Sequence, residues 1–244
     1  MTTVGFLYPG HAAEDDYPLA SGVLGVPFVV AHTYGTDLHA VAELLDLGSA
    51  SRLASGAAEL RRHATGAVVW ACTSGSFVYG WEGAREQAAQ LEAAAGVPAS
   101  STSFAFVNAA RALGVTRVAV AASYPAEVAT RFVDFLAAGG IEVVHFASYD
   151  IHTAAEVGVL APEAVTELVA ANDHPDAEAI LVPDTAMRTF ALVPALEQRL
   201  GKPVLTANQV TIWEGLRLAE IVGPWQDAGA LFRTPVGVLT GAVP

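Results

Sequence analysis

A lone cysteine among small polar residues is the chemically most suggestive feature of this sequence. Cys72 is the single cysteine of the chain; it follows an apolar run and precedes Thr73, Ser74 and a glycine. A turn of this composition exposes backbone N–H groups, which together with the two hydroxyls would cradle a carboxylate or an enediolate. These donors would lower the pKa of the thiol, and a thiolate is both a nucleophile and a base. The alternative is that Cys72 is a small buried core residue.

A second polar turn follows another apolar run and contains Asp184, Thr185 and Arg188. Asp184 is a candidate general acid or base acting opposite Cys72. An equally good interpretation is that it caps the next helix or pairs with Arg188 four residues later. We expect Thr185 and Arg188 to contact a substrate carboxylate, although Arg188 also suits a structural role.

Three side chains in loops after apolar runs are further candidates for ligand contact. Tyr124 would offer its phenol to a developing oxyanion, whereas His152 and His11 would place polar rings near a ligand. An ordinary position on a surface loop explains each of them equally well. His11 and the acids at 14–16 resemble a metal site, but adjacent acids more often solvate a loop, so we expect no metal.

Composition narrows the partners of the chain. The formal charge is −13, from 25 acidic and 12 basic residues, which disfavours nucleic acid and anionic membranes. No apolar run is long enough to span a membrane, and the N-terminus lacks the pattern of a signal peptide. One cysteine excludes an internal disulfide and fits a reducing compartment. We therefore expect a cytoplasmic protein; whether copies form a homo-oligomer stays open.

Apolar runs alternate with longer stretches of helical character, which predicts an α/β fold. Most of the runs are apolar throughout, as in parallel strands covered by helices on both faces. The expected strands are residues 4–8, 28–32, 67–71, 118–122, 143–146, 180–183 and 204–207. The expected helices are residues 49–63, 81–95, 103–113, 126–138, 162–171, 191–200 and 209–218.

The chain also resembles itself at strand ends. The run ending in Tyr8-Pro9 matches the one ending in Tyr124-Pro125, and the runs leading to Cys72 and Asp184 match each other in order and spacing. Chance similarity between ordinary strands is the alternative. A repeat predicts a first half-domain of residues 1–112, a second of residues 113–207, and a segment 208–244 that packs back on the first. Ligands of such sheets bind beyond the carboxyl ends of the strands, so one cleft would hold both turns.

Several of these segments together resemble the aspartate/glutamate racemase superfamily, in particular its maleate cis–trans isomerase and arylmalonate decarboxylase branch. The segments that carry the resemblance are 71–76, 123–125, 184–189 and 201–213. It implies two pseudo-symmetric Rossmann-like half-domains with parallel sheets, an active site at their interface, and neither metal nor organic cofactor. Thr73, Ser74 and Tyr124 match the branch's carboxylate-binding group. Asp184 stands where a second cysteine is expected. The asparagine expected just after the first strand is replaced at Ala12 or its neighbour, and His152 stands near a second expected asparagine; these changes argue against maleate itself as substrate.

The resemblance implies an isomerase or racemase-like enzyme that acts on a small carboxylate or dicarboxylate through Cys72, with Asp184 as the second catalytic residue. A cofactor-free decarboxylase of arylmalonate type is the alternative, because one cysteine is enough to protonate the enediolate left by carbon dioxide. A carboxylate-binding protein without catalysis is the third hypothesis.

Overall fold

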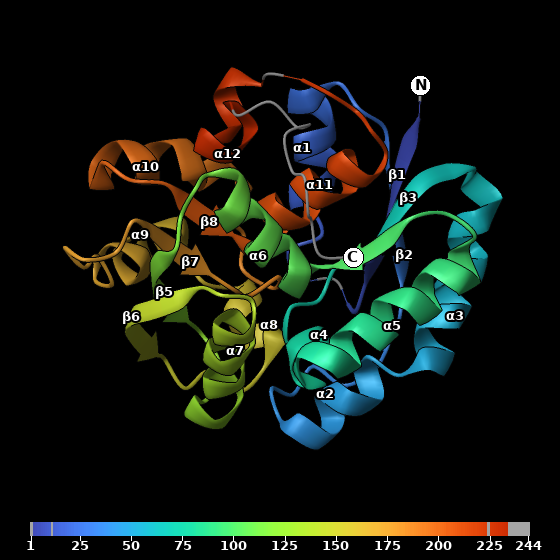
Figure 1. Cartoon of the computed structure of the whole chain (residues 1–244), viewed down its shortest axis with the longest axis horizontal. Helices are drawn as coiled ribbons and strands as arrows, with labels where there is room; N and C mark the ends of the chain where they lie inside the picture. The colour runs from blue at the N-terminus through green and yellow to red at the C-terminus, as the bar shows by residue number, and fades with distance from the viewer. Residues whose placement is uncertain (1, 11, 224, 234–244) are drawn as a thin grey trace.

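Two separate parallel sheets form the frame of the computed structural model, which describes residues 2–10, 12–223 and 225–233. Figure 1 shows the first sheet on the right and the second on the left, with helices around both. Each sheet has four strands and all pairings are parallel. The expected fold class, two similar α/β halves, is confirmed.

Strand order is the same in the two sheets. The first has the order β2-β1-β3-β4 and consists of β1 (Thr3–Tyr8), β2 (Phe28–His32), β3 (Thr65–Trp70) and β4 (Ala99–Ser101). The second has the order β6-β5-β7-β8 and consists of β5 (Arg117–Ala122), β6 (Glu142–Ser148), β7 (Ala179–Val182) and β8 (Val204–Thr206). β1 corresponds to β5 and β3 to β7. Tyr8 is the last residue of β1 and Tyr124 lies two residues beyond the end of β5, whereas Cys72 and Asp184 each follow their strand by two residues. This agreement supports the internal repeat.

Helices cover these sheets, and most of the expected ones are present. The longer helices are α3 (Ala50–Leu60), α5 (Gly80–Ala95), α6 (Thr102–Ala112), α7 (Ala126–Ala138), α9 (Pro162–Ala170), α10 (Val193–Leu200) and α11 (Ala207–Leu218). Five helices were not expected from the sequence: α1 (Asp16–Leu24), α2 (Val41–Leu47), α4 (Ser74–Phe77), α8 (Ala154–Gly158) and α12 (Ala230–Arg233). Helix α1 escaped prediction because it contains Pro18, Ser21 and Gly22, which are poor helix formers.

Helices α6 and α11 pack together between the two sheets (Figure 1). Their contact is partly polar: the hydroxyls of Thr102 and Thr211 are 2.6 Å apart, and the Asn108 amide donates to Glu214 at 3.0 Å. Helix α11 also packs on β3, as expected for a segment that returns to the first half. The domain boundaries stay a prediction, and residues 234–244 of the returning segment lie outside the described residues.

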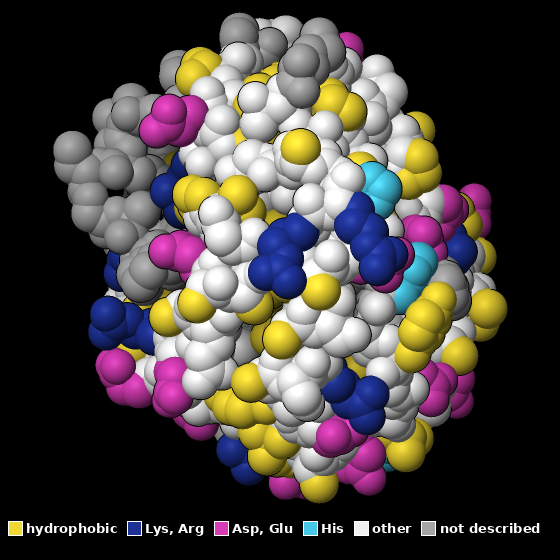
Figure 2. All heavy atoms as spheres, turned by 90° about the vertical axis from the view of Figure 1, so that its right-hand side faces the viewer, with side chains coloured by type: hydrophobic (Ala, Val, Ile, Leu, Met, Phe, Trp, Pro, Cys, Tyr) yellow, Lys and Arg dark blue, Asp and Glu magenta, His cyan; other side chains and the backbone are white. Residues whose placement is uncertain are grey.

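No helix in the described part of the chain is both long and apolar enough to cross a membrane. On the face drawn in Figure 2, acidic and basic side chains are interspersed. The excess negative charge of the sequence is therefore not gathered into one patch on that face.

Candidate active site

A cavity of about 420 Å³ lies at the carboxyl ends of both sheets. Cys72 enters its wall from the turn after β3, and Asp184 from the turn after β7. Ser74 and Thr185, the hydroxyl residues of the same turns, also line it. The rest of the wall is largely apolar and includes Leu38, Leu44, Leu47, Ala154, Ala155 and Val159. The fold thus brings the two polar turns of the sequence to one cleft.

Cys72 is buried, with 4% of its surface exposed. Its sulfur accepts the backbone N–H of Gly75 at 3.3 Å and lies 3.8 Å from the Ser74 hydroxyl. Space beside Gly75 is tight, because a Cβ there would be 3.0 Å from the sulfur. Burial raises the pKa of the Cys72 thiol to about 11, and the donors from Gly75 and Ser74 lower it only in part. The expectation of a lowered pKa is wrong for this structure, because desolvation outweighs the hydrogen bonds.

Thr73 and Tyr124 lie behind the cavity wall. The Thr73 hydroxyl is fully buried and has no hydrogen-bond partner among the described residues. The Tyr124 phenol donates to the carbonyl of Pro183 at 2.7 Å. Burial raises the pKa of Tyr124 well above its usual value, and Asp184 and Cys72 raise it further. Because Asp184 and Cys72 both act on the pKa of Tyr124, its phenol lies close to the two candidate catalytic groups.

Asp184 is buried and held by two donors. Its carboxylate accepts hydrogen bonds from the Ser123 hydroxyl and from the backbone N–H of Ala186, the latter at 2.9 Å. The carboxylate therefore caps its own turn, and both of its oxygens are committed. Arg188 is not its partner: the guanidinium bonds to Asp15 at 2.9 Å and to the carbonyl of Gly158, while still lining the cavity.

Of the two histidines expected to contact a ligand, the described one, His152, does not line the cavity. His152 is 66% exposed, lies 3.7 Å from Asp150, and is absent from the lining of this cavity. His11 lies outside the described residues. Within the described ranges, no group of three or more His, Cys, Asp or Glu side chains has the geometry to hold a metal ion.

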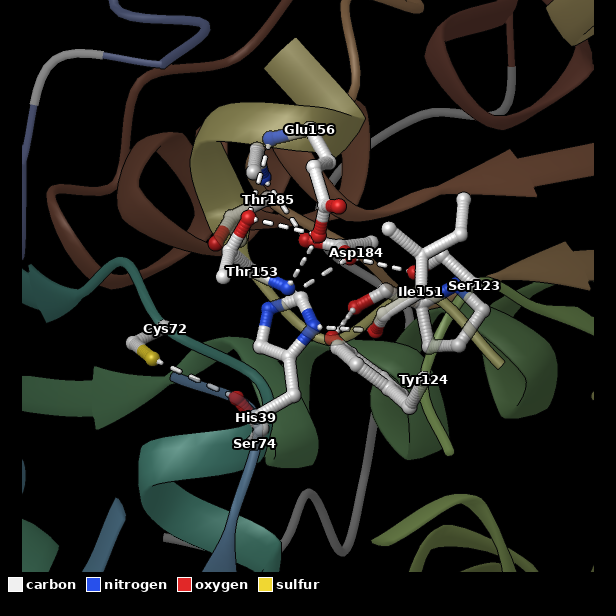
Figure 3. A network of polar contacts seen from close by, with 12 residues as sticks. His39, Cys72, Ser74, Ser123, Tyr124, Ile151, Thr153, Glu156, Asp184 and Thr185 are labelled. Atoms are coloured by element: carbon white, nitrogen blue, oxygen red, sulfur yellow. Dashed lines mark hydrogen bonds and ion pairs between the residues drawn. The ribbon is translucent and has the colours of Figure 1, made fainter. Parts of the chain in front are cut away.

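Sequence reasoning missed two residues of the wall, His39 and Tyr8. The His39 ring lies 3.9 Å from Asp184 through Nε2, and Figure 3 shows it pointing toward Asp184 and Ile151. The Tyr8 phenol donates to the carbonyl of Thr185 at 2.7 Å and so joins the two halves. Tyr8 was recognisable from its match with Tyr124. His39 lies seven residues after β2, and its loop carries no pattern that marks it.

Comparisons with known proteins show the family of the chain. The arylmalonate decarboxylase family model matches residues 36–232. Arylmalonate decarboxylase from Bordetella bronchiseptica is 30% identical over 237 residues, which cover 89% of this chain and 90% of that protein. Maleate isomerase from Alcaligenes faecalis is 29% identical over 124 residues, about half of each chain (50% and 48%).

Solved structures show the same fold. Maleate isomerase from Pseudomonas putida S16, crystallised with maleate, superposes with a TM-score of 0.89 at 21% identity and covers 97% of this chain and 99% of its own. A liganded double mutant of arylmalonate decarboxylase gives a TM-score of 0.83 at 25% identity, with coverages of 95% and 99%. The fold and the cavity define a two-sheet α/β enzyme of the maleate isomerase and arylmalonate decarboxylase branch. The chain belongs to the arylmalonate decarboxylase family.

Proposed function

We propose that this enzyme is a cofactor-independent isomerase of racemase type that acts on a small carboxylate or dicarboxylate. One observation carries the proposal: Cys72 and Asp184 line the same cavity from equivalent strand ends of the two sheets. A reaction that moves a proton from one face of a carbon to the other needs an acid and a base on opposite sides. Two residues related by the repeat would supply this arrangement.

In the proposed step the Asp184 side takes the proton from the carbon next to the carboxylate, and the C–H electron pair moves into the carboxylate to give an enediolate. The Cys72 thiol then donates its proton to the opposite face, so a new C–H bond forms and the sulfur becomes a thiolate. A pKa of about 11 keeps Cys72 as a thiol at neutral pH, which suits a proton donor. Afterwards the Asp184 side releases the abstracted proton to solvent and the thiolate takes one up, so the enzyme returns to its starting form.

The substrate carboxylate would be held by neutral donors. Ser74 and Thr185 line the cavity, and the unpartnered Thr73 hydroxyl lies just behind it. Arg188 is the one Lys or Arg among the described lining residues, and it is engaged by Asp15 and Gly158. Hydroxyl and amide donors that strengthen as charge develops favour the enediolate over the bound substrate.

The relatives support a pair of reactive positions. The liganded arylmalonate decarboxylase mutant carries one exchange of glycine to cysteine and one of cysteine to serine, at positions 114 residues apart (188 − 74). Cys72 and Asp184 are 112 residues apart (184 − 72). A maleate isomerase from Nocardia farcinica, with one cysteine replaced by serine, contains a covalently bound succinylcysteine intermediate.

A decarboxylase of substituted malonates is the second candidate. It is favoured by the apolar residues of the cavity, among them Leu38, Leu44 and Val159, because an apolar wall disfavours the charged carboxylate that departs. It needs a proton donor on one face only, which Cys72 would be. The buried carboxylate of Asp184 would repel a dianion, which counts equally against a malonate and against a dicarboxylate substrate of the isomerase.

Incubation in D2O with maleate, aspartate, hydantoins and arylmalonates, followed by NMR, tests the two candidates. An isomerase exchanges the hydrogen on the carbon next to the carboxylate, or converts maleate, and releases no carbon dioxide; a decarboxylase releases carbon dioxide and places one deuterium in the product. In either case Cys72→Ser should lose turnover and keep ligand binding. Unchanged turnover in Cys72→Ser would refute a role for this thiol. If the wild type binds these compounds but turns none of them over, the result would support the hypothesis of a carboxylate-binding protein without catalysis.

A further inference from the structure

The loop of residues 33–40 carries His39 from the first half of the molecule to the second. Backbone hydrogen bonds fasten this loop to the segment after β6: His39 N–H donates to His152 at 2.7 Å, and Ala154 N–H donates to Asp37 at 2.8 Å. Leu38 and Thr153 form an antiparallel bridge between these bonds. His39 is therefore held in place at the second half, where it lines the cavity beside Asp184.

The hydrogen bond on one side of the His39 ring decides what the other side can do. Nδ1 lies 3.0 Å from the carbonyl oxygen of Ile151, and because a carbonyl only accepts, Nδ1 must carry a hydrogen. In a neutral ring Nε2 is then a proton acceptor. It lies 3.9 Å from the Asp184 carboxylate, whose oxygens also accept hydrogen bonds. A proton taken up by Nε2 would therefore lie beside a carboxylate.

The electrostatics of the cavity point the same way. The titratable groups that share its described wall with His39 are Tyr8, Asp37, Cys72, Asp184 and Arg188, and Tyr124 packs edge-on against the ring at 4.9 Å. Arg188 is bound to Asp15, and burial raises the pKa of both phenols and of the thiol, which keeps them neutral. Once the His39 ring takes up a proton, it is the nearest positive charge to Asp184 among the described wall residues. The two side chains are 5% and 3% exposed, so their attraction is weakly screened.

We propose that His39 and Asp184 act as one acid–base pair that takes up and releases a single proton on the face of the substrate opposite Cys72. The pair would replace a second thiol with a carboxylate and an imidazole. A separation of 3.9 Å is about 1 Å longer than an N–H···O bond, and such contacts in enzyme sites often tighten when substrate binds.

This inference rests on the proposed function and assigns the base of its proton-transfer step. The pair accepts the proton in the form in which the His39 ring is neutral: the proton leaves carbon for the free Nε2, Asp184 stabilises the imidazolium that forms, and the electron pair stays on the substrate as the enediolate. After Cys72 donates its proton, the pair holds one proton more and the thiol one fewer. The thiolate and the protonated pair are the forms needed for the reverse direction, so the same residues serve both.

Nitrogen-15 NMR of the histidine rings tests the pair without substrate, with the His39 signals assigned by their loss in His39→Gln. We expect Nδ1 of His39 to be protonated throughout. At constant pH, Asp184→Asn should shift the Nε2 signal of His39, because it removes the carboxylate that lies 3.9 Å from this nitrogen. His152→Gln, in the exposed loop nearby, should leave the His39 signals unchanged. An unprotonated Nδ1, or a His39 ring indifferent to Asp184→Asn, would overturn the pair.

Rates of deuterium exchange, with a carboxylate that the wild type turns over, give the second test. His39→Gln and Asp184→Asn should each lower kcat by about 100-fold with little change in KM, and the double variant should lose no more than either one. His39→Asn, which keeps an amide near Ile151 but has no base, should lose as much, and His152→Gln should keep full activity. Full activity in His39→Gln would refute the pair even if Cys72→Ser is inactive. Full activity in Cys72→Ser would instead refute the proposed function and leave the NMR test of the pair standing.

Discussion

The environment of Cys72 predicts a slow and strongly pH-dependent reaction with alkylating agents. Burial raises the pKa of this thiol from 9.0 to about 11. At neutral pH the fraction of Cys72 present as thiolate falls about tenfold for each unit by which the pKa rises, or about 100-fold in all. Because only the thiolate reacts, iodoacetamide should label the folded protein at least 100-fold more slowly than the same chain unfolded in urea.

The assay is direct because the chain has one cysteine, so every labelled molecule is labelled at Cys72. The rate should rise about tenfold per pH unit up to about pH 11, as long as the protein stays folded. Asp184→Asn should raise the rate by less than tenfold, because the carboxylate is a smaller cause of the raised pKa than burial. Cys72→Ser provides the unlabelled control.

A labelling rate that levels off below about pH 9 would refute this reasoning, because it would mean that the donors of the turn outweigh desolvation. A labelling rate that rises with pH but is about tenfold lower in Asp184→Asn than in the wild type would show that the carboxylate lowers the pKa of the thiol instead of raising it. Both results are measured on the folded protein, whose integrity circular dichroism checks at each pH.

Three further predictions concern stability. The raised pKa of Cys72 stabilises the fold below about pH 9, and this contribution is lost as the pH rises to about 11. The free energy of unfolding of the wild type, measured in urea, should therefore fall by about 1.4 kcal/mol per pH unit in this window relative to Cys72→Ser. Parallel pH profiles of the two proteins would contradict this prediction. Gly48→Ala should cost about 1–3 kcal/mol of stability, because its Cβ would overlap the carbonyl oxygen of Gly75. Gly22→Ala in α1 should be neutral or stabilising, because no heavy atom lies within 4 Å of the new Cβ. Equal urea midpoints of the two variants would refute the difference. Asp16→Ala should cost about 3 kcal/mol of stability, because Asp16 is buried and accepts hydrogen bonds from Asn208, Thr189 and Phe190. Asp15→Ala, which removes an exposed ion pair with Arg188, should cost less than about 1 kcal/mol. A loss below about 1 kcal/mol in Asp16→Ala would contradict the first value.

Features that depend on neighbouring residues were readable from the sequence. Residues 28–32 and 126–138 were predicted with the bounds that β2 and α7 have, because runs of apolar residues and helical periodicity report local structure directly. The positions of Cys72 and Asp184 at strand ends followed from the same patterns. Strand β4 was missed because Ser100 and Ser101 look like loop residues, although both are buried in the sheet.

The environment of the site, by contrast, was decided by contacts between distant segments. The partners of His39 are Ile151 and Asp184, which lie more than 100 residues away in the sequence. Arg188 binds Asp15 and not the neighbouring Asp184. The pKa of Cys72 shows the same division: its donors come from the next three residues and are visible in the sequence, but the burial that outweighs them is supplied by both halves of the molecule. A sequence specifies which groups lie along the chain, whereas desolvation and pairing depend on which of them the folded chain packs together.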